Sequence, residues 1–86
     1  MYELRMGRHA IGALRKMPRP YIQRIRRELD KLAENPERRD IDVAKLRGRS
    51  GYRLRVGDYR IIFERDNKAQ IINVLRIASR GQVYRR

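Results

Sequence analysis

The sequence predicts an α+β domain in which an N-terminal helical hairpin packs on one face of a mainly antiparallel sheet. Apolar residues alternate at the start of the chain, recur at helical spacing over residues 8–34, and alternate again from residue 52. The expected order of elements is β-α-α-β-β-β. A chain of 86 residues has room for one domain, so we expect a single domain over residues 1–86.

The first strand is expected at residues 2–6, where Tyr2, Leu4 and Met6 alternate with charged residues. A short helix is expected over residues 8–17, because Ala10, Leu14 and Met17 share one helical face. Prolines at positions 18 and 20 end this helix.

The second helix is the clearest element of the sequence and should cover residues 20–34. Pro20 suits its first turn, and Asn35 followed by Pro36 ends it, with Asn35 able to adopt a left-handed conformation. Five apolar residues at helical spacing form its expected buried face: Ile22, Ile25, Leu29, Leu32 and Ala33. Because the connection between the helices is so short, they should form an antiparallel hairpin.

Residues 36–51 are polar and are expected to be irregular, with the apolar residues of 43–46 anchoring the loop. Period-two alternation then predicts strands at 52–56 and 59–64, joined by Gly57-Asp58 in a type II′ turn. A further turn at 66–68 leads to residues 70–78, which are apolar on both faces and should form a central strand.

A two-residue turn at Gly57-Asp58 fixes the pairing of its two strands. It places Arg55 opposite Arg60 and brings Arg53 onto the same face, away from the apolar residues. Like charges directly opposite each other repel, and folding does not require them. A ligand with negative charge, such as a phosphodiester, explains the cluster; the alternative is an exposed face that Glu64 or Asp58 neutralises.

The net charge of the whole chain also favours a ligand with negative charge. Lys and Arg number 23 against 10 Asp and Glu, which gives a net charge of +13, and 19 of the 23 are arginine. Arginine binds phosphate through a planar fork, although genomic composition or a hot environment could also favour arginine over lysine. The excess of positive charge predicts a polyanionic partner, nucleic acid first and an acidic protein second.

Several classes of site are excluded or disfavoured. Without cysteine there is no disulfide, thiol catalysis or cysteine-bound zinc, and the only histidine, His9, is expected to lie at the surface or pack on a helix. Asp40 and Asp42 alone are too few for a metal site, so we expect neither a metal nor a cofactor. The chain lacks a membrane-spanning apolar run and a signal peptide, which predicts a cytoplasmic protein.

Four motifs in order resemble the RelE/ParE superfamily of bacterial and archaeal toxins, across essentially the whole chain. They are Lys-Leu-Arg-Gly at 45–48, Tyr-Arg-Leu-Arg-Val-Gly-Asp-Tyr-Arg-Ile-Ile-Phe at 52–63, Leu-Arg-Ile-Ala-Ser-Arg at 75–80 and Val-Tyr at 83–84. The resemblance implies the RelE-like fold and a cognate acidic antitoxin as partner. In the RelE branch it further implies a ribosome-dependent endoribonuclease that cuts the mRNA codon in the A site through attack by the ribose 2′-OH.

The resemblance also assigns roles to individual residues. Arg60 and Arg80 would stabilise charge in the transition state, Arg53 and Arg55 would hold the phosphate, and Tyr84 would stack on a base or take part in proton transfer. Further contacts to RNA are expected from five basic residues: Lys45, Arg47, Arg76, Arg85 and Arg86.

Two departures from the family pattern affect the expected chemistry. The best-known RelE toxins carry lysines where this chain has Arg53 and Arg55, and many relatives carry histidine or lysine where it has Ser79. Arginine does not lose a proton in proteins, so it cannot serve as a general base. Two alternatives therefore stand beside the endonuclease: a ParE-type inhibitor of DNA gyrase, and a non-catalytic relative that binds an antitoxin or RNA.

Overall fold

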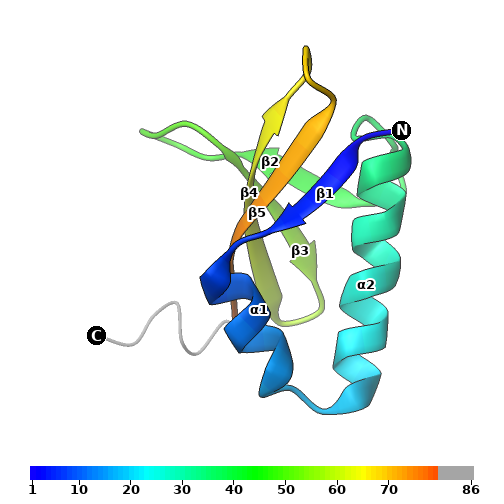
Figure 1. The fold of residues 1–86 in the computed structure, drawn as a ribbon, viewed down its shortest axis with the longest axis vertical. Coiled ribbons are helices and arrows are strands. Elements are labelled where there is room, and N and C mark those ends of the chain that lie inside the picture. The colour runs from blue at the N-terminus through cyan, green and yellow to red at the C-terminus, as the bar shows by residue number, and fades with distance from the viewer. Residues whose placement is uncertain (80–86) are drawn as a thin grey trace.

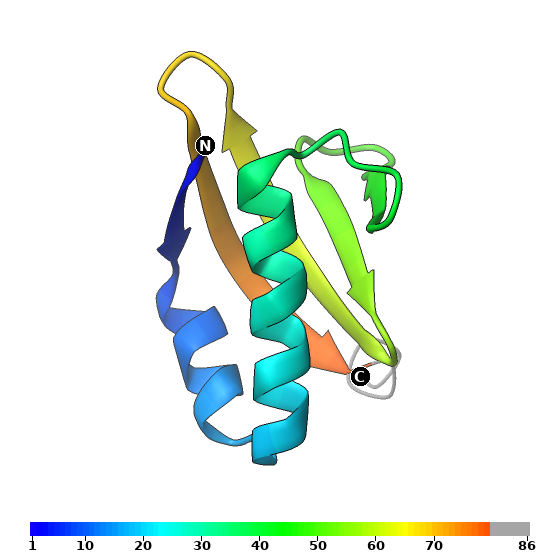
Figure 2. The ribbon, with the colours of Figure 1, turned by 90° about the vertical axis from the view of Figure 1, so that its right-hand side faces the viewer.

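The structure, a computed structural model, describes residues 1–79. Two helices cover one face of a five-stranded sheet (Figures 1 and 2). The elements are β1 (Glu3–Met6), α1 (Arg8–Arg15), α2 (Arg19–Glu34), β2 (Asp42–Lys45), β3 (Tyr52–Val56), β4 (Tyr59–Asp66) and β5 (Ile71–Ser79). The predicted α+β class and the helical pair on one sheet face are confirmed, with one strand more than expected.

The strands lie in the order β1-β5-β4-β3-β2. The first strand pairs in parallel with the last, and every other pairing is antiparallel. β5 therefore has a hydrogen-bonded neighbour on each side, which confirms the prediction of an interior strand from its apolar sequence.

The additional strand is β2, in the segment that the sequence led us to expect as irregular. That expectation is wrong for Asp42–Lys45, which pairs with β3 and places Val43 opposite Leu54. Four residues at a sheet edge are too few to give a clear alternation, and Asp and Ala are poor strand formers. Only the pairing with β3 makes this segment a strand.

The end of α2 also differs from the expectation. Asn35 has an extended backbone, with φ −158° and ψ 103°, instead of a left-handed one. Its side-chain oxygen accepts a hydrogen bond from the backbone N–H of Glu37 at 2.9 Å, so the residue starts a turn of its own. Pro20 lies in the first turn of α2, as predicted.

The core lies between the helices and the sheet. α2 contributes Ile25, Leu29 and Leu32, and α1 contributes Ala10. The sheet contributes alternate residues of its central strands: Leu54, Val56, Ile61, Phe63, Ile72, Val74 and Ile77. Within residues 1–79, no helix combines the length and the apolar character that crossing a bilayer requires.

Arg65 closes the end of this core near the N-terminus. Its guanidinium carbon lies 5.8 Å from the ring centre of Tyr2 and 6.0 Å from that of Tyr52. The same guanidinium donates hydrogen bonds to Asn67 at 2.7 Å and to Glu37 at 3.0 Å. Arg65 is thus a structural arginine. From β4 it contacts Tyr2 directly before β1, Tyr52 on β3 and Glu37 in the loop after α2.

Candidate nucleic-acid interface

The β3–β4 hairpin has the register predicted from the Gly57-Asp58 turn. Val56 lies opposite Tyr59, and Arg55 lies opposite Arg60. Gly57 has φ of 59°, whereas Asp58 is not among the residues with positive φ, as a type II′ turn requires. The turn chemistry therefore fixes which side chains face one another across the hairpin.

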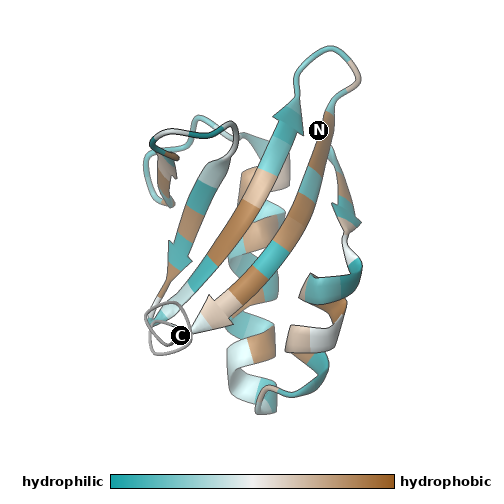
Figure 3. Ribbon diagram, turned by 90° about the vertical axis from the view of Figure 1, so that its left-hand side faces the viewer, coloured by the Kyte–Doolittle hydropathy of each residue, from teal (hydrophilic) through white to brown (hydrophobic). Residues whose placement is uncertain are grey.

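This register brings Arg53, Arg55 and Arg60 to the sheet face that the helices leave uncovered. Three of their neighbours along the strands, Leu54, Val56 and Ile61, are buried under the helices, so the arginines point the other way. Figure 3 views this face, with α2 behind the sheet and α1 beside it. The predicted grouping of the three arginines is confirmed.

A β-bulge adds a fourth arginine. The pairing of β4 with β5 moves from Ile62 opposite Arg76 to Phe63 opposite Val74, so Leu75 is the extra residue. Leu75 and Arg76 are both exposed, while Val74 and Ile77 on either side are buried. The bulge thus lets Arg76 share the outer face with the other arginines while Ile77 stays in the core.

We call this set the arginine face: Arg53, Arg55, Arg60 and Arg76. Two cross-strand rows hold its members side by side. One row runs from Arg55 to Arg60 across β3 and β4, and the other runs from Arg53 through Ile62 to Arg76. Side chains directly opposite on a sheet have Cβ atoms about 4.5–5.5 Å apart, so one phosphate group can contact more than one guanidinium.

Asp42 on β2 is the acidic residue that partly neutralises this face. Its Oδ1 lies 3.5 Å from Nη1 of Arg53, and its Oδ2 lies 4.0 Å from Nε of Arg55. The sequence pointed to Glu64 or Asp58 for this role and not to Asp42, because residue 42 was not predicted to lie on a strand. Four arginines against one aspartate leave an excess of three positive charges, and no ion pair engages Arg60 or Arg76 within residues 1–79.

The arginines differ in how freely they can reach a ligand. The Arg53 side chain is 17% exposed and the Arg55 side chain is 51% exposed. Arg53 is held against the sheet beside Asp42, whereas Arg55 extends into solvent. Arg55 therefore has the greater freedom to reach a ligand, whereas Arg53 and Arg60 are half-buried and offer their guanidinium groups from fixed places on the sheet.

The remaining predicted contact residues lie elsewhere. Lys45 lines a separate open groove of about 650 Å³, together with Tyr52 and Asn73. Arg47 is exposed in the loop between β2 and β3. Arg80, Tyr84, Arg85 and Arg86 lie outside the described residues, so their predicted place beside the arginine face stays a prediction.

The arginine face can bind and neutralise phosphate but has no proton acceptor among its arginines. The two nearby aspartates, Asp40 in the loop before β2 and Asp42 on β2, are both held by arginines. Asp42 pairs with Arg53, and Asp40 accepts two hydrogen bonds of 2.8 Å from Arg38. These hydrogen bonds lower the pKa of Asp40 to about 2, so this carboxylate stays ionised.

One family model covers most of the chain. The model of the ParE toxin of the type II toxin–antitoxin system parDE matches residues 5–84. No curated protein matches the chain.

The solved structures include several that share this fold. The archaeal RelE–RelB complex from Pyrococcus horikoshii OT3 contains a chain 32% identical to this one, with 94% of this chain and 97% of that chain covered at a TM-score of 0.81. The RelB–RelE antitoxin–toxin complex from Methanococcus jannaschii matches at 23% identity, covering 93% and 94% at a TM-score of 0.77. The isolated E. coli RelE toxin matches at 20% identity, covering 92% and 84% at 0.76. The family match and the identity to the Pyrococcus chain together show that this chain belongs to the RelE/ParE superfamily of type II toxin–antitoxin toxins.

Proposed function

We propose that this toxin is a ribosome-dependent endoribonuclease that cuts mRNA at the codon in the A site. The observation that carries the proposal is the placement of Arg55 directly opposite Arg60 on an open sheet face, with Arg76 close by in the second row. Folding gains nothing from this like-charged pair, whereas an RNA phosphate would relieve the repulsion.

The proposed reaction is an internal transesterification. The ribose 2′-oxygen bonds to the adjacent phosphorus and gives up its proton, while the bond to the 5′-oxygen breaks and that oxygen gains a proton. The products are a 2′,3′-cyclic phosphate and a 5′-OH. The phosphorane-like transition state carries more negative charge than the substrate, and guanidinium groups aimed at it lower the barrier. We assign this role to Arg60 and Arg80, and the binding of the phosphate to Arg53 and Arg55.

Proton transfer needs a group other than these arginines. Tyr84 is our candidate in the chain, since a tyrosine can transfer a proton or stack on the base next to the scissile bond. Positioning of the mRNA on the ribosome supplies the remainder of the rate enhancement. Holding the 2′-oxygen in line with the leaving oxygen removes much of the entropic barrier.

The proposal includes an acidic antitoxin and action in the cytoplasm, where ribosomes are found. Structures from Pyrococcus horikoshii and Methanococcus jannaschii hold a RelE toxin together with a RelB antitoxin. A net charge of +13 makes an acidic protein the natural inhibitor, since the two charges would cancel on binding.

The test is induced expression with and without the Arg60→Ala change, followed by mapping of the 5′ ends of cellular mRNA. We expect cuts within translated codons for the native chain and none for Arg60→Ala. Arg39→Ala is the matched control, since Arg39 is exposed and distant in sequence from the arginine face, and should cut as the native chain does. Growth arrest with intact mRNA would contradict the proposal.

A second candidate function is inhibition of DNA gyrase, because the matching family model describes ParE toxins. Purified toxin added to gyrase in a supercoiling assay tests it. Inhibition at a stoichiometric ratio, with mRNA left intact in cells, would favour this function. A chain that neither cuts mRNA nor inhibits gyrase would be a non-catalytic relative.

A further inference from the structure

Most of the positive charge of this chain lies outside the arginine face. No acidic residue occurs between Glu3 and Glu28, and this stretch contains eight arginines and lysines. It therefore supplies eight of the thirteen net positive charges, whereas the arginine face with Asp42 supplies three. The acid-free stretch forms the end of β1, all of α1 and the first half of α2.

The helices turn these basic residues toward solvent. α1 buries Ala10 and α2 buries Ile25 and Leu29, so the opposite sides of both helices remain free. Five exposed residues on α1, on α2 and in their connection form what we call the helical basic face: Arg8, Arg15, Lys16, Arg19 and Arg27. None of the five forms an ion pair with another residue of 1–79.

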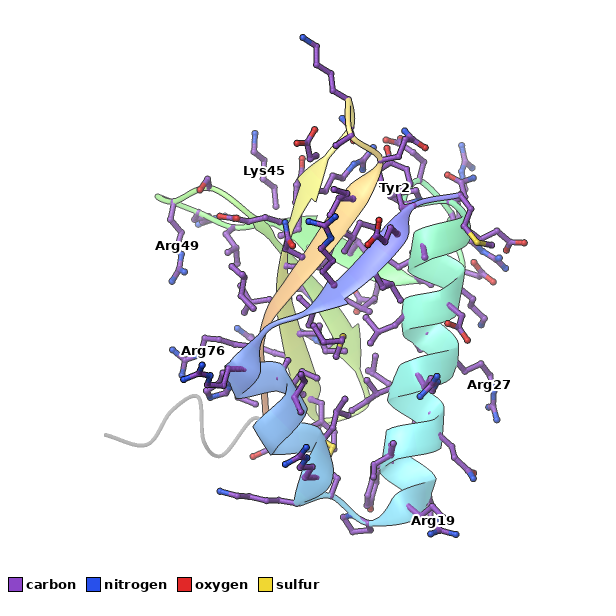
Figure 4. All side chains as sticks on the ribbon, in the orientation of Figure 1. Tyr2, Arg19, Arg27, Lys45, Arg49 and Arg76 are labelled. Atoms are coloured by element: carbon purple, nitrogen blue, oxygen red, sulfur yellow. The ribbon has the colours of Figure 1, made fainter. Side chains whose placement is uncertain are left out.

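The α2 part of this face, Arg19 and Arg27, lies on the other side of the molecule from Arg76 of the arginine face (Figure 4). In Figure 4, Arg27 projects from α2 away from the sheet and Arg19 projects at the lower end of the helix, whereas Arg76 projects on the opposite side. A ligand on the arginine face therefore leaves Arg19 and Arg27 open.

The folding of the helices does not explain Arg8 and Arg19. Neither α1 nor α2 has an acidic residue in its first turn, and Arg8 and Arg19 occupy those turns instead. Basic residues there oppose the helix dipole. The chain thus retains positive charge where helix stability favours the opposite sign.

We propose that the helical basic face binds the phosphate backbone of folded RNA, as a docking surface separate from the arginine face. A surface of exposed arginines without paired acids suits the backbone of a polyanion. An acidic protein partner would need an apolar centre, and the large apolar side chains exposed on these two helices are Ile11 (40%) and Tyr21 (45%), one on each helix. The apolar groove between β1 and the helices, which contains Leu4 and Ile22, is lined by none of the five basic residues.

The direct test measures binding of the purified toxin to a short RNA duplex over a range of salt concentrations. Each phosphate contact contributes about 0.9 to the slope of log affinity against log salt concentration. The double variant Arg19→Gln/Arg27→Gln should lower this slope by about two. The control Arg39→Gln/Lys68→Gln removes the same charge from exposed residues outside both faces and should leave the slope unchanged. Equal slopes for the native chain and Arg19→Gln/Arg27→Gln would overturn the proposal.

The choice of RNA as ligand rests on the proposed function, but binding to a duplex requires no cleavage and is tested independently of it. On ribosomes, Arg19→Gln/Arg27→Gln should raise KM several-fold and leave kcat unchanged, whereas Arg60→Ala should lower kcat. Loss of affinity for the acidic antitoxin, with RNA binding retained, would assign the face to a protein partner and overturn the inference. Weakened RNA binding by a toxin that cuts no mRNA would support the docking surface while contradicting the endonuclease.

Discussion

Arg55 on β3 and Arg60 on β4 lie directly opposite each other on the open face of the sheet. Each is the nearest outward-facing residue of its strand to the Gly57-Asp58 turn, so the hairpin cannot separate them without losing its register. Two guanidinium groups are thus held together by the same pairing that buries Leu54 against Ile61.

Replacing Arg60 with threonine should raise stability while removing toxicity. Relief of a like-charged cross-strand pair is worth about 0.2–1 kcal/mol, and threonine is a good strand former. Urea denaturation measures the free energy of unfolding, and growth after induction measures toxicity. If repulsion between the two arginines is the cause, the double variant Arg55→Thr/Arg60→Thr should gain less free energy of unfolding than the two single variants gain together. Strict additivity would contradict the repulsion.

Asp42 should limit how tightly the arginine face binds RNA. It lies 3.5 Å from Arg53 and 4.0 Å from Arg55, and Asp42→Asn removes this negative charge while keeping a similar shape. We expect tighter binding of single-stranded RNA and a steeper salt dependence. Asp58→Asn, at the exposed turn of the hairpin, makes the same change in net charge and should have the smaller effect. Equal effects of the two variants would show that only overall charge matters.

The pairing of Arg55 with Arg60 in the β3–β4 hairpin could be predicted because neighbouring residues of the sequence determine it. Gly57-Asp58 specifies a two-residue turn, and period-two alternation specifies which side chains share a face. Nothing beyond residues 52–64 is needed for that result. The helices could be predicted for the same reason, since their apolar spacing is contained within each segment.

The parts that could not be predicted depend on residues far apart in the sequence. β2 is a strand only because it pairs with β3, and Asp42 reaches the arginine face only through that pairing. Arg76 reaches it through a bulge in the pairing with β4, where alternation along β5 alone would turn Arg76 and Ile77 the other way. The acid-free stretch before Glu28 is visible in the sequence, but its solvent-facing placement depends on which helical sides the sheet covers.

The Arg38–Asp40 pair should make stability depend on pH in the acidic range. Hydrogen bonds from Arg38, with its charge and that of Lys31, lower the pKa of Asp40 from 3.8 to about 2. A carboxyl with a lowered pKa in the folded state stabilises the fold fully above 3.8, and this contribution disappears as pH falls through about 2. Asp40→Asn should therefore be less stable than the native chain at neutral pH, and the difference should shrink between those two values.

Urea denaturation at a series of pH values measures this difference. Asp30→Asn is the control, because Asp30 is an exposed carboxyl of α2 without an ion pair in the described part of the chain. A difference for Asp40→Asn that stays constant down to pH 2 would mean that Arg38 does not hold this carboxylate in solution.

Replacing either of two glycines near α1 with alanine should change the stability of the fold, in opposite directions for the two positions. A Cβ on Gly7 would lie 2.9 Å from the backbone oxygen of Val74, which accepts a 2.7 Å hydrogen bond from the Gly7 N–H. The Gly7 backbone is extended, with φ −70°, so the lack of space is the sole obstacle. Because the obstructing atom belongs to the backbone of β5, it cannot rotate away, and Gly7→Ala should lose about 1–3 kcal/mol of stability.

Gly12 lies within α1, and a Cβ there would meet no atom within 4 Å. Alanine lowers the conformational entropy of the unfolded chain and favours the helix. Gly12→Ala should therefore raise the free energy of unfolding by about 0.5–1 kcal/mol. Urea denaturation measures the free energy of unfolding of both variants. Gly7→Ala and Gly12→Ala make the same substitution at positions five residues apart. Destabilisation by Gly12→Ala would show that the solvent side of α1 is covered, and since Arg8 and Arg15 lie on that side, it would also contradict the openness of the helical basic face.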